Sequence, residues 1–186
     1  GVEGMAEVQE GDDLSGQMMD AADRQGTPIE AGDMLVVTQK VVSKTEGRVI
    51  SLEGIEPSEM AIRITEGHRR DPRHTEMILR ESARIVRMDR GVIISETHHG
   101  FQCANAGIDA SNIPGSDTIA LLPVDPDASA RRVRDDVKSR LGVDVAVIIS
   151  DTFGRPWRAA AASTSSAICA NWRGWTGCPS ADRPAP

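Results

Sequence analysis

The chain is poor in aromatic residues and lacks tyrosine. Aromatic side chains make up 3% of its 186 residues, so a core has to be built from Val, Ile, Leu, Met and Ala. No apolar run approaches the roughly 20 residues that span a bilayer as a helix. No basic, apolar leader opens the sequence either. These features predict a cytoplasmic protein that does not enter a membrane.

Paired cysteines and an excess of positive charge are also missing. The three cysteines, Cys103, Cys169 and Cys178, form no Cys-x-x-Cys pair, which argues against a disulfide framework and against a zinc site. The formal net charge of −7 disfavours nonspecific binding to nucleic acid. With 39% hydrophobic residues, the chain can still form a domain with a substantial core.

Common signatures of nucleotide-binding and hydrolytic sites are absent as well. The sequence has no GxxxxGK[ST] loop, no GxGxxG after a strand, no HExxH and no GxSxG. Function therefore has to be inferred from less common groupings of residues.

Turn and capping residues predict alternating helices and strands. Helices are expected to begin after Asp12-Asp13, Pro57-Ser58, Asp71-Pro72 and Asp125-Pro126. Strands are expected at residues 34–38, 49–52, 92–95, 118–122 and 143–150. The last of these is a nearly continuous apolar run, which is typical of a strand buried on both faces.

Two lysines lie four residues apart in the stretch VVTQKVVSKTEGR, residues 36–48. We expect a strand to deliver Lys40 and Lys44, with Gln39 beside them. Lysine is a compact charge suited to phosphate oxygens. The alternative is a solvated strand end with no ligand.

Small polar residues are concentrated in HHGFQCANAGIDASN, residues 98–112. Glycine and alanine permit a close approach of the backbone to a ligand, and Asp109 offers hard oxygen ligands. The alternative is a loop whose Asn and Asp side chains satisfy its own backbone.

The apolar run at 143–150 leads into Asp151 and Thr152. Ligands of open sheets bind at the carboxyl ends of strands, and a carboxylate next to a hydroxyl suits Mg²⁺ or Mn²⁺. An ordinary strand-to-turn cap is the alternative. Separated aspartates, lysines and the lack of an acyl-transfer nucleophile together indicate phosphate chemistry with a divalent metal.

Seven stretches together resemble one family, the coenzyme F420-0:L-glutamate ligases, or gamma-glutamyl ligases. They occur in the family order and span roughly residues 1–158. They read GDDL, GDMLVVTQKVVSKTEGR, PSEMA, DPRHTEMILRES, GFQCANAGIDASN, LLPVDPDASAR and VIISDTFGRPWR. The resemblance implies an α/β fold of the mixed α+β kind, with mixed sheets and flanking helices, and an intertwined homodimer.

The resemblance further implies a reaction that joins L-glutamate to the deazaflavin precursor, coenzyme F420-0. GTP phosphorylates the terminal carboxylate of the precursor, and the glutamate amine then attacks the acyl phosphate. Mg²⁺ or Mn²⁺ neutralises charge on the transferring phosphoryl group, and K⁺ is a further candidate cofactor. No protein nucleophile is expected.

Site residues are carried over from the family motifs. The implied metal ligands are Asp109, Asp151 and Thr152. The implied GTP contacts are Gln39, Lys44, Asn112 and the segment Met5, Ala6, Glu7 and Val8. Met5-Ala6 stands where the family usually has Leu-Pro, a departure that contacts through the backbone could tolerate.

The family pattern is expected to end at about Arg158. Residues 159–186 contain one Ile and no Leu, Val, Met or Phe, which predicts a disordered tail that is unlike the family. A frameshift would produce such a change, leaving a partial ligase domain at residues 1–158. Two alternatives to an active ligase therefore remain: an inactive remnant that only dimerises or binds nucleotide, and an unrelated phosphate-binding module.

Overall fold

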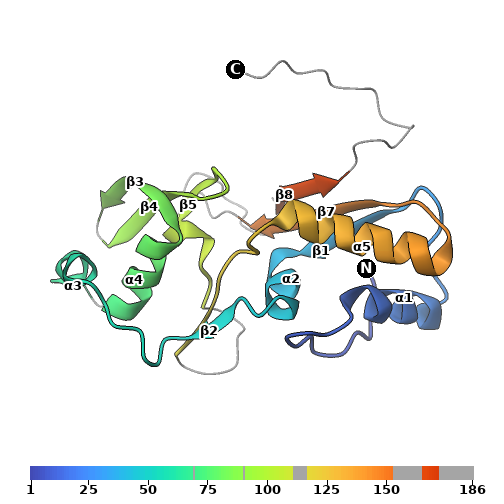
Figure 1. The fold of residues 1–186 in the computed structure, drawn as a ribbon, viewed down its shortest axis with the longest axis horizontal. Helices are drawn as coiled ribbons and strands as arrows, with labels where there is room; N and C mark the ends of the chain where they lie inside the picture. Colours follow the sequence, from blue (N-terminus) through green and yellow to red (C-terminus); the bar gives the residue numbers. More distant parts are fainter. Residues whose placement is uncertain (69, 90, 111–116, 153–164, 172–186) are drawn as a thin grey trace, which may run out of the picture.

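The computed structural model describes residues 1–68, 70–89, 91–110, 117–152 and 165–171, with backbone only for Thr152 and for residues 165–171. These residues form a mixed α/β fold with two lobes (Figure 1). Sequence analysis predicts the same fold class, and the structure confirms it.

The larger lobe is built on a three-stranded sheet in the order β1-β7-β8. Strand β1 (Met34–Thr38) pairs in parallel with β7 (Ala146–Thr152), so that Thr38 lies beside Ser150. Strand β8 (Ser165–Asn171) pairs antiparallel with the other edge of β7. The sheet is accompanied by helices α1 (Leu14–Gln25), α2 (Gln39–Thr45) and α5 (Pro126–Leu141).

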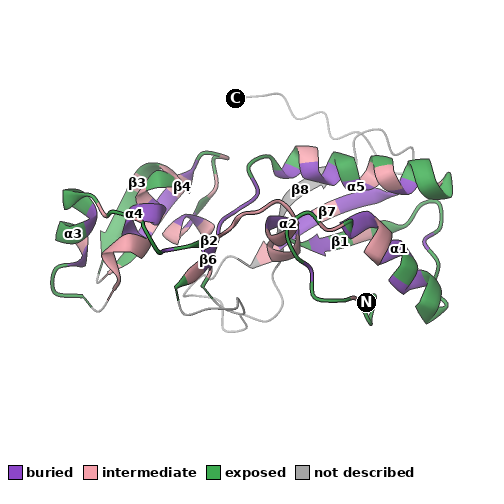
Figure 2. Cartoon of the chain, turned by 60° about the horizontal axis from the view of Figure 1, so that its bottom comes forward, coloured by how far each residue is buried: buried purple, intermediate pink, exposed green. Residues whose placement is uncertain are grey.

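Strand β7 provides the centre of the larger core. Val147 and Ile149 are fully buried, and α5 contributes Val133 and Val137 to the same cluster. The buried residues between sheet and helices form a continuous layer (Figure 2). The predicted apolar strand is thus confirmed, although it continues to Thr152 instead of ending at Ser150.

Predicted caps fix the ends of the two long helices. Asp13 accepts a hydrogen bond from the Gly16 amide at the start of α1, and Asp125 accepts one from the Ala128 amide at the start of α5. Gly142 ends α5 in the left-handed conformation, at φ 72°. Both helices therefore begin where the acidic residues predict.

The smaller lobe contains the antiparallel sheet β3-β4-β5 and two helices. Its elements are α3 (Glu59–Thr65), α4 (Pro72–Arg80), β3 (Ser82–Asp89), β4 (Val92–Thr97) and β5 (Gln102–Ala104). Ser58 and Asp71 cap α3 and α4 as predicted. Ile78 of α4 and Ile93 of β4 are fully buried in this lobe's core.

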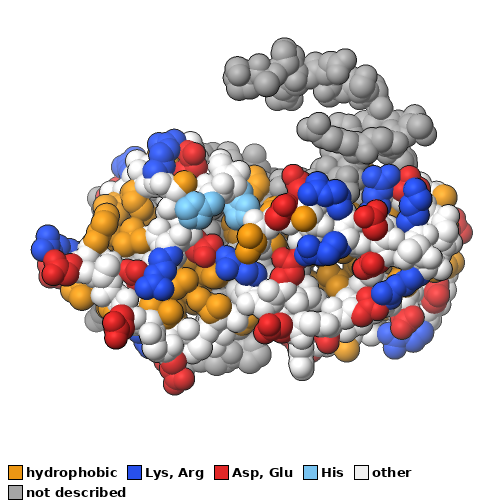
Figure 3. Space-filling model, viewed as in Figure 1, with side chains coloured by type: hydrophobic (Ala, Val, Ile, Leu, Met, Phe, Trp, Pro, Cys, Tyr) orange, Lys and Arg blue, Asp and Glu red, His pale blue; other side chains and the backbone are white. Residues whose placement is uncertain are grey.

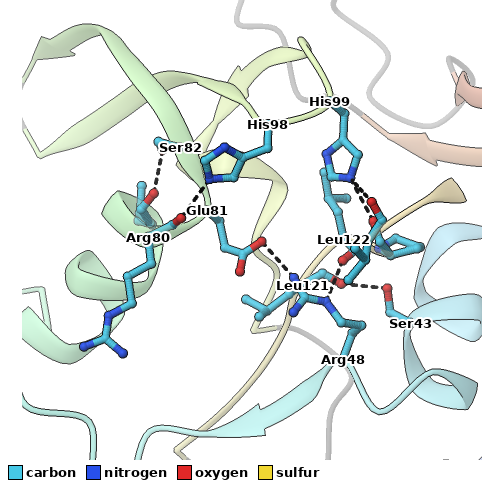
Figure 4. Close-up of polar contacts among 12 residues, drawn as sticks. Ser43, Arg48, Arg80, Glu81, Ser82, His98, His99, Leu121 and Leu122 are labelled. Atoms are coloured by element: carbon cyan, nitrogen blue, oxygen red, sulfur yellow. Dashed lines mark hydrogen bonds and ion pairs between the residues drawn. The ribbon is translucent and has the colours of Figure 1, made fainter.

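Polar contacts connect the lobes next to the short antiparallel pair β2 (Val49–Ser51) and β6 (Thr118–Ala120). The Arg48 guanidinium donates from Nε to the Leu122 carbonyl at 2.9 Å and from Nη2 to Glu81 Oε2 at 2.8 Å. A ring nitrogen of His99 contacts the Pro123 carbonyl at 2.9 Å (Figure 4). Arg48 therefore joins the chain after α2 to the corner between α4 and β3.

Strands β3 and β5 were not predicted, and two segments that were predicted differ in the structure. Residues 39–45 form helix α2 and not the end of a strand, because burial of Val42 and Ser43 against the sheet outweighs the strand preference of adjacent valines. Residues 165–171 lie in the predicted disordered tail but form β8. Their backbone N–H and C=O groups pair with β7, which requires no particular side-chain pattern.

Among the described residues, no helix has both the length and the apolar character needed to cross a membrane.

Candidate functional site

Helix α2 begins directly after β1 and carries three of the polar residues that sequence analysis singles out. Gln39 is its first residue, Lys40 its second, and Lys44 lies one turn further on. The register of β1 against β7 places Thr38 beside Ser150, so α2 begins close to Asp151. The fold thus brings the lysine motif and the Ser-Asp-Thr motif to one edge of the sheet.

A pocket of about 350 Å³ lies between the N-terminal segment and the end of α2. Its lining is formed by Glu7, Val8, Gln9, Glu10, Lys44, Gly47 and Val49. The Gly11 amide donates to the Thr45 carbonyl at 3.0 Å, which holds the N-terminal segment against α2. Three of the predicted nucleotide contacts, Glu7, Val8 and Lys44, therefore line one pocket.

Lys44 already has an anionic partner in this pocket. Its ammonium group forms an ion pair with the Glu7 carboxylate. The Lys44 side chain is only 16% exposed, whereas that of Glu7 is 72% exposed. The cation is thus fixed in the wall of the pocket, and its anion projects toward solvent.

The other predicted nucleotide contacts lie elsewhere. Met5 packs against the core of the larger lobe, and Ala6 is exposed. Gln39 is buried, and its amide nitrogen donates to Ser43 Oγ at 2.7 Å and to the Leu121 carbonyl at 3.1 Å. The Gln39 side chain thus holds α2 against the chain after β6. Asn112, the remaining predicted contact, lies outside the described residues.

Asp109 directly follows Ile108 of the smaller lobe's core and is paired with the other lysine. Its Oδ2 is 2.8 Å from Lys40 Nζ. Its backbone exchanges both hydrogen bonds with Ala120, which fixes it beside β6. The carboxylate is 43% exposed, so a cation from solvent can reach it.

The turn before Asp109 has an unusual backbone. Asn105 and Ala106 both have φ near +54°, a left-handed conformation that costs a non-glycine residue about 1–3 kcal/mol. Gly107 has φ +73°, and a Cβ there would lie 2.9 Å from Leu122 Cδ1. The small residues of the ANAG motif therefore permit a tight turn against Leu122, as their composition suggests.

Asp151 lies near Cys103 of strand β5. Burial raises the pKa of the Cys103 thiol to about 11, and the negative charge of Asp151 adds to the effect. Of the two predicted metal-binding aspartates, Asp151 thus lies at the end of β7 near β5, and Asp109 lies beside β6, paired with Lys40 of α2. The side chain of the third predicted ligand, Thr152, lies outside the described part of the chain.

The donor set is chemically suited to a hard divalent cation. Carboxylate oxygens are the ligands that Mg²⁺ and Mn²⁺ prefer. No cluster of three His, Cys, Asp or Glu side chains that could hold a metal occurs among the residues that the structure describes. Asp109 and Asp151 therefore remain individual candidate ligands in the described part of the chain.

Sequence analysis missed a polar group beside this turn. Arg70 Nη2 donates to Asn105 Oδ1 at 3.1 Å, and burial lowers the pKa of the Arg70 guanidinium. Burial, together with the charge of Arg70, also lowers the pKa of His74. The only sequence signal for this contact is that Arg70 directly precedes Asp71-Pro72, where α4 begins.

The structure is thus that of a mixed α/β protein with a lysine-bearing pocket and a second lysine paired with an aspartate. A profile of the F420-0:Gamma-glutamyl ligase family matches residues 4–180. The chain therefore belongs to the F420-0:Gamma-glutamyl ligase family. The match extends past Arg158, the position at which the sequence alone predicts the family pattern to end.

Curated relatives agree with this assignment. The chain is 45% identical over 169 residues to the coenzyme F420:L-glutamate ligase of Methanothermobacter thermautotrophicus, covering 90% of this chain and 66% of the relative. It is 48% identical over 151 residues to the Methanopyrus kandleri protein of the same name, covering 81% and 58%. The Methanocaldococcus jannaschii protein is 43% identical over 148 residues, covering 78% and 59%. The chain thus spans about three fifths to two thirds of the length of these relatives.

Proposed function

We propose that this chain acts as a coenzyme F420-0:L-glutamate ligase that forms an amide bond at the expense of GTP. Family membership supports the reaction class, and the relatives' names supply glutamate and coenzyme F420 as substrates. The observation that carries the proposal is α2, which presents Lys44 to the pocket and Lys40 to Asp109.

In the proposed reaction, a carboxylate oxygen of F420-0 attacks the γ-phosphorus of GTP, and the bond to GDP breaks. The amine of L-glutamate then attacks the acyl phosphate carbon, phosphate leaves, and the amine loses a proton. Lys40 and Lys44 offset negative charge on the nucleotide phosphates. No side chain of the protein becomes covalently bonded to the substrate.

Asp109 and Asp151, with Thr152, are the residues proposed to hold Mg²⁺ or Mn²⁺. Such an ion supplies positive charge that stabilises the transferring phosphoryl group. The ion pair with Lys40 holds the Asp109 carboxylate beside α2. K⁺ is included as a further candidate cofactor. We also propose a cytoplasmic location, in keeping with the proposed use of GTP.

We also propose a homodimer, supported by an exposed apolar surface on the smaller lobe. Val86 and Met88 of edge strand β3 are 41% and 48% exposed, and Met60 of α3 is 52% exposed. Hydrophobic side chains are visible on the surface of this lobe (Figure 3). An unpaired edge strand with apolar side chains favours association with another copy.

Light scattering of the native chain and of Met88→Lys tests this proposal. A dimer that uses this face should dissociate in the variant, because the substitution places a charge in the apolar surface.

Mass spectrometry tests the proposed activity directly. The native chain is incubated with GTP, Mn²⁺ or Mg²⁺, L-glutamate and F420-0, with and without K⁺, and the product is examined for one added glutamyl residue. Asp109→Asn and Asp151→Asn should abolish the product, and the exposed control Asp23→Asn should retain it. Binding of GTP without product would favour the inactive remnant, and binding that does not distinguish GTP from other nucleotides would favour an unrelated phosphate-binding module.

A further inference from the structure

The ion pair between Glu7 and Lys44 has a geometry that bears on nucleotide affinity. Both residues line the same pocket, and Glu7 comes from the N-terminal segment while Lys44 lies in the last turn of α2. Lys44 is largely enclosed, so few approaches to its ammonium group are open. Glu7 occupies one of them with a carboxylate, which has the charge and the acceptor oxygens that a phosphate would bring.

We propose that Glu7 is an internal competitor for the nucleotide, and that its carboxylate must leave Lys44 before a phosphate can bind there. This inference rests on the proposed nucleotide function of the pocket. It gives Glu7 a role opposite to that of an attractive contact, because the side chain lowers the affinity that Lys44 provides. The proposal concerns the side chain only, so backbone contacts of the same segment are compatible with it.

The cost of releasing Glu7 is small for a clear physical reason. Its side chain is 72% exposed, so the freed carboxylate is solvated at once. Exposed ion pairs contribute little to stability, and breaking one corresponds to a factor of about 1.5 to 5 in an equilibrium constant. The apparent affinity falls by the fraction of molecules in which Lys44 is available. Glu7 thus lowers the affinity modestly, because its displacement from Lys44 costs little free energy.

The segment that carries Glu7 is anchored on both sides, which restricts the movement to the side chain. The Gly11 amide bonds to the Thr45 carbonyl, and Val8 is buried. On the other side, the Glu3 amide donates to Gln25 Oε1 at 2.8 Å. A rotation of the Glu7 side chain toward solvent is therefore sufficient to free Lys44.

Calorimetric titration of the full chain with GTP and Mg²⁺ tests the proposal. Glu7→Gln should bind GTP about 1.5- to 5-fold more tightly than the native chain. Glu3→Gln is the matched control, because it removes one negative charge from the same segment but does not line the pocket. Its affinity should equal that of the native chain, and circular dichroism verifies that each variant is folded.

A double-mutant cycle separates competition at Lys44 from general repulsion of phosphate. Lys44→Gln should weaken GTP binding about tenfold or more. In that background, Glu7→Gln should no longer increase affinity, because there is no cation left to compete for. An equal gain in both backgrounds, or weaker binding by Glu7→Gln alone, would overturn the proposal.

Failure of the wider function has a different signature. If the native chain, Glu7→Gln and Lys44→Gln all fail to bind GTP, the nucleotide pocket itself is wrong, and the role of Glu7 is wrong with it. If the native chain binds GTP, Lys44→Gln does not, and Glu7→Gln binds no better than native, only the competitor role is wrong.

Discussion

Among the residues that the structure describes, fourteen buried apolar side chains form the core of the larger lobe, and eight form the core around α4 and β4 in the smaller lobe. In the larger lobe, a strand lies at the centre of its sheet and is covered by helices. In the smaller lobe, strand β3 is an edge strand with most of its residues exposed. Among the described residues, the larger lobe therefore buries more apolar side chains, whereas both lobes have side-chain helix caps and ion pairs.

The candidate site lies where these two kinds of structure meet. The lysines come from α2 of the larger lobe, and Asp109 follows the turn that packs against the smaller core. A rigid sheet thus positions the cations, and a tight turn positions one of the carboxylates. Changes in either lobe can alter the site through the contacts between them.

The largest effect is expected at the centre of the larger sheet. Ile149→Ala should lower the free energy of unfolding by about 2–5 kcal/mol, because the side chain is fully buried and leaves a cavity. Val36→Ala, in the neighbouring strand but 60% exposed, is the control and should cost no more than about 1 kcal/mol. Urea unfolding measures both, and equal losses would contradict the assignment of β7 as the central strand.

In the smaller lobe, a buried carboxylate should make stability depend on pH. Glu76 accepts hydrogen bonds from the Ser58 amide at 3.0 Å and from Arg80 Nε at 2.8 Å. These contacts lower the pKa of Glu76 from 4.5 to about 2, and the contact with Ser58 contributes more to this shift than the contact with Arg80. Because the folded pKa lies below the unfolded one, the stabilisation is present above pH 4.5 and is lost as the pH falls toward 2.

The loss over this pH range should be on the order of 2–3 kcal/mol, since Glu76 is 8% exposed. Glu76→Gln should be less stable at pH 7 and should show a flatter profile between pH 5 and pH 2. Glu59→Gln, whose side chain is 88% exposed, should keep the native profile. Stability measured as a function of pH by urea unfolding decides the matter, and a native-like profile for Glu76→Gln would refute the explanation.

The contact between the lobes should have an intermediate effect. Arg48→Met removes the hydrogen bond to the Leu122 carbonyl and leaves Glu81, with a side chain 20% exposed, without its cation. Loss of a charged hydrogen bond in a partly buried place should cost about 1–3 kcal/mol. Arg63→Met breaks an exposed ion pair and should leave stability unchanged within error. Thermal unfolding compares the two, and a neutral Arg48→Met would mean that Arg48 does not help to hold the lobes together.

Sequence reasoning succeeded where a local physical rule determines structure. Acidic residues before proline or leucine predicted the starts of α1, α4 and α5, because a carboxylate satisfies free amides at a helix N-terminus. The apolar run predicted β7, because a fully covered strand needs apolar residues on both faces. Both signals depend only on neighbours in the sequence.

Elements and contacts that depend on distant residues were not predictable in this way. Strand β3 has the sequence SARIVRMD, which alternates poorly because most of its residues are exposed. Helix α2 contains adjacent valines that favour a strand, and burial against β7 and β6 determines its conformation instead. Lys40, Lys44 and Asp109 were identifiable as charged candidates. Their actual partners were not, because the ion pairs join separate segments of the folded chain.

The smallest effect compares equivalent caps in the two lobes. Asp125 of α5 and Asp71 of α4 both accept a hydrogen bond from an amide of the first helical turn. Serine retains this capping function, so Asp125→Ser should change the unfolding free energy by no more than about 0.5 kcal/mol.

Asp71 also binds the Arg73 guanidinium, with Nη2 2.6 Å from Oδ2, and this contact lowers the pKa of Asp71. Asp71→Ser should therefore cost up to about 1 kcal/mol more than Asp125→Ser. The excess should shrink in 1 M salt, where exposed charges are screened over about 3 Å. An equal cost for the two variants at low salt would mean that the pair with Arg73 adds nothing to the stability of the smaller lobe.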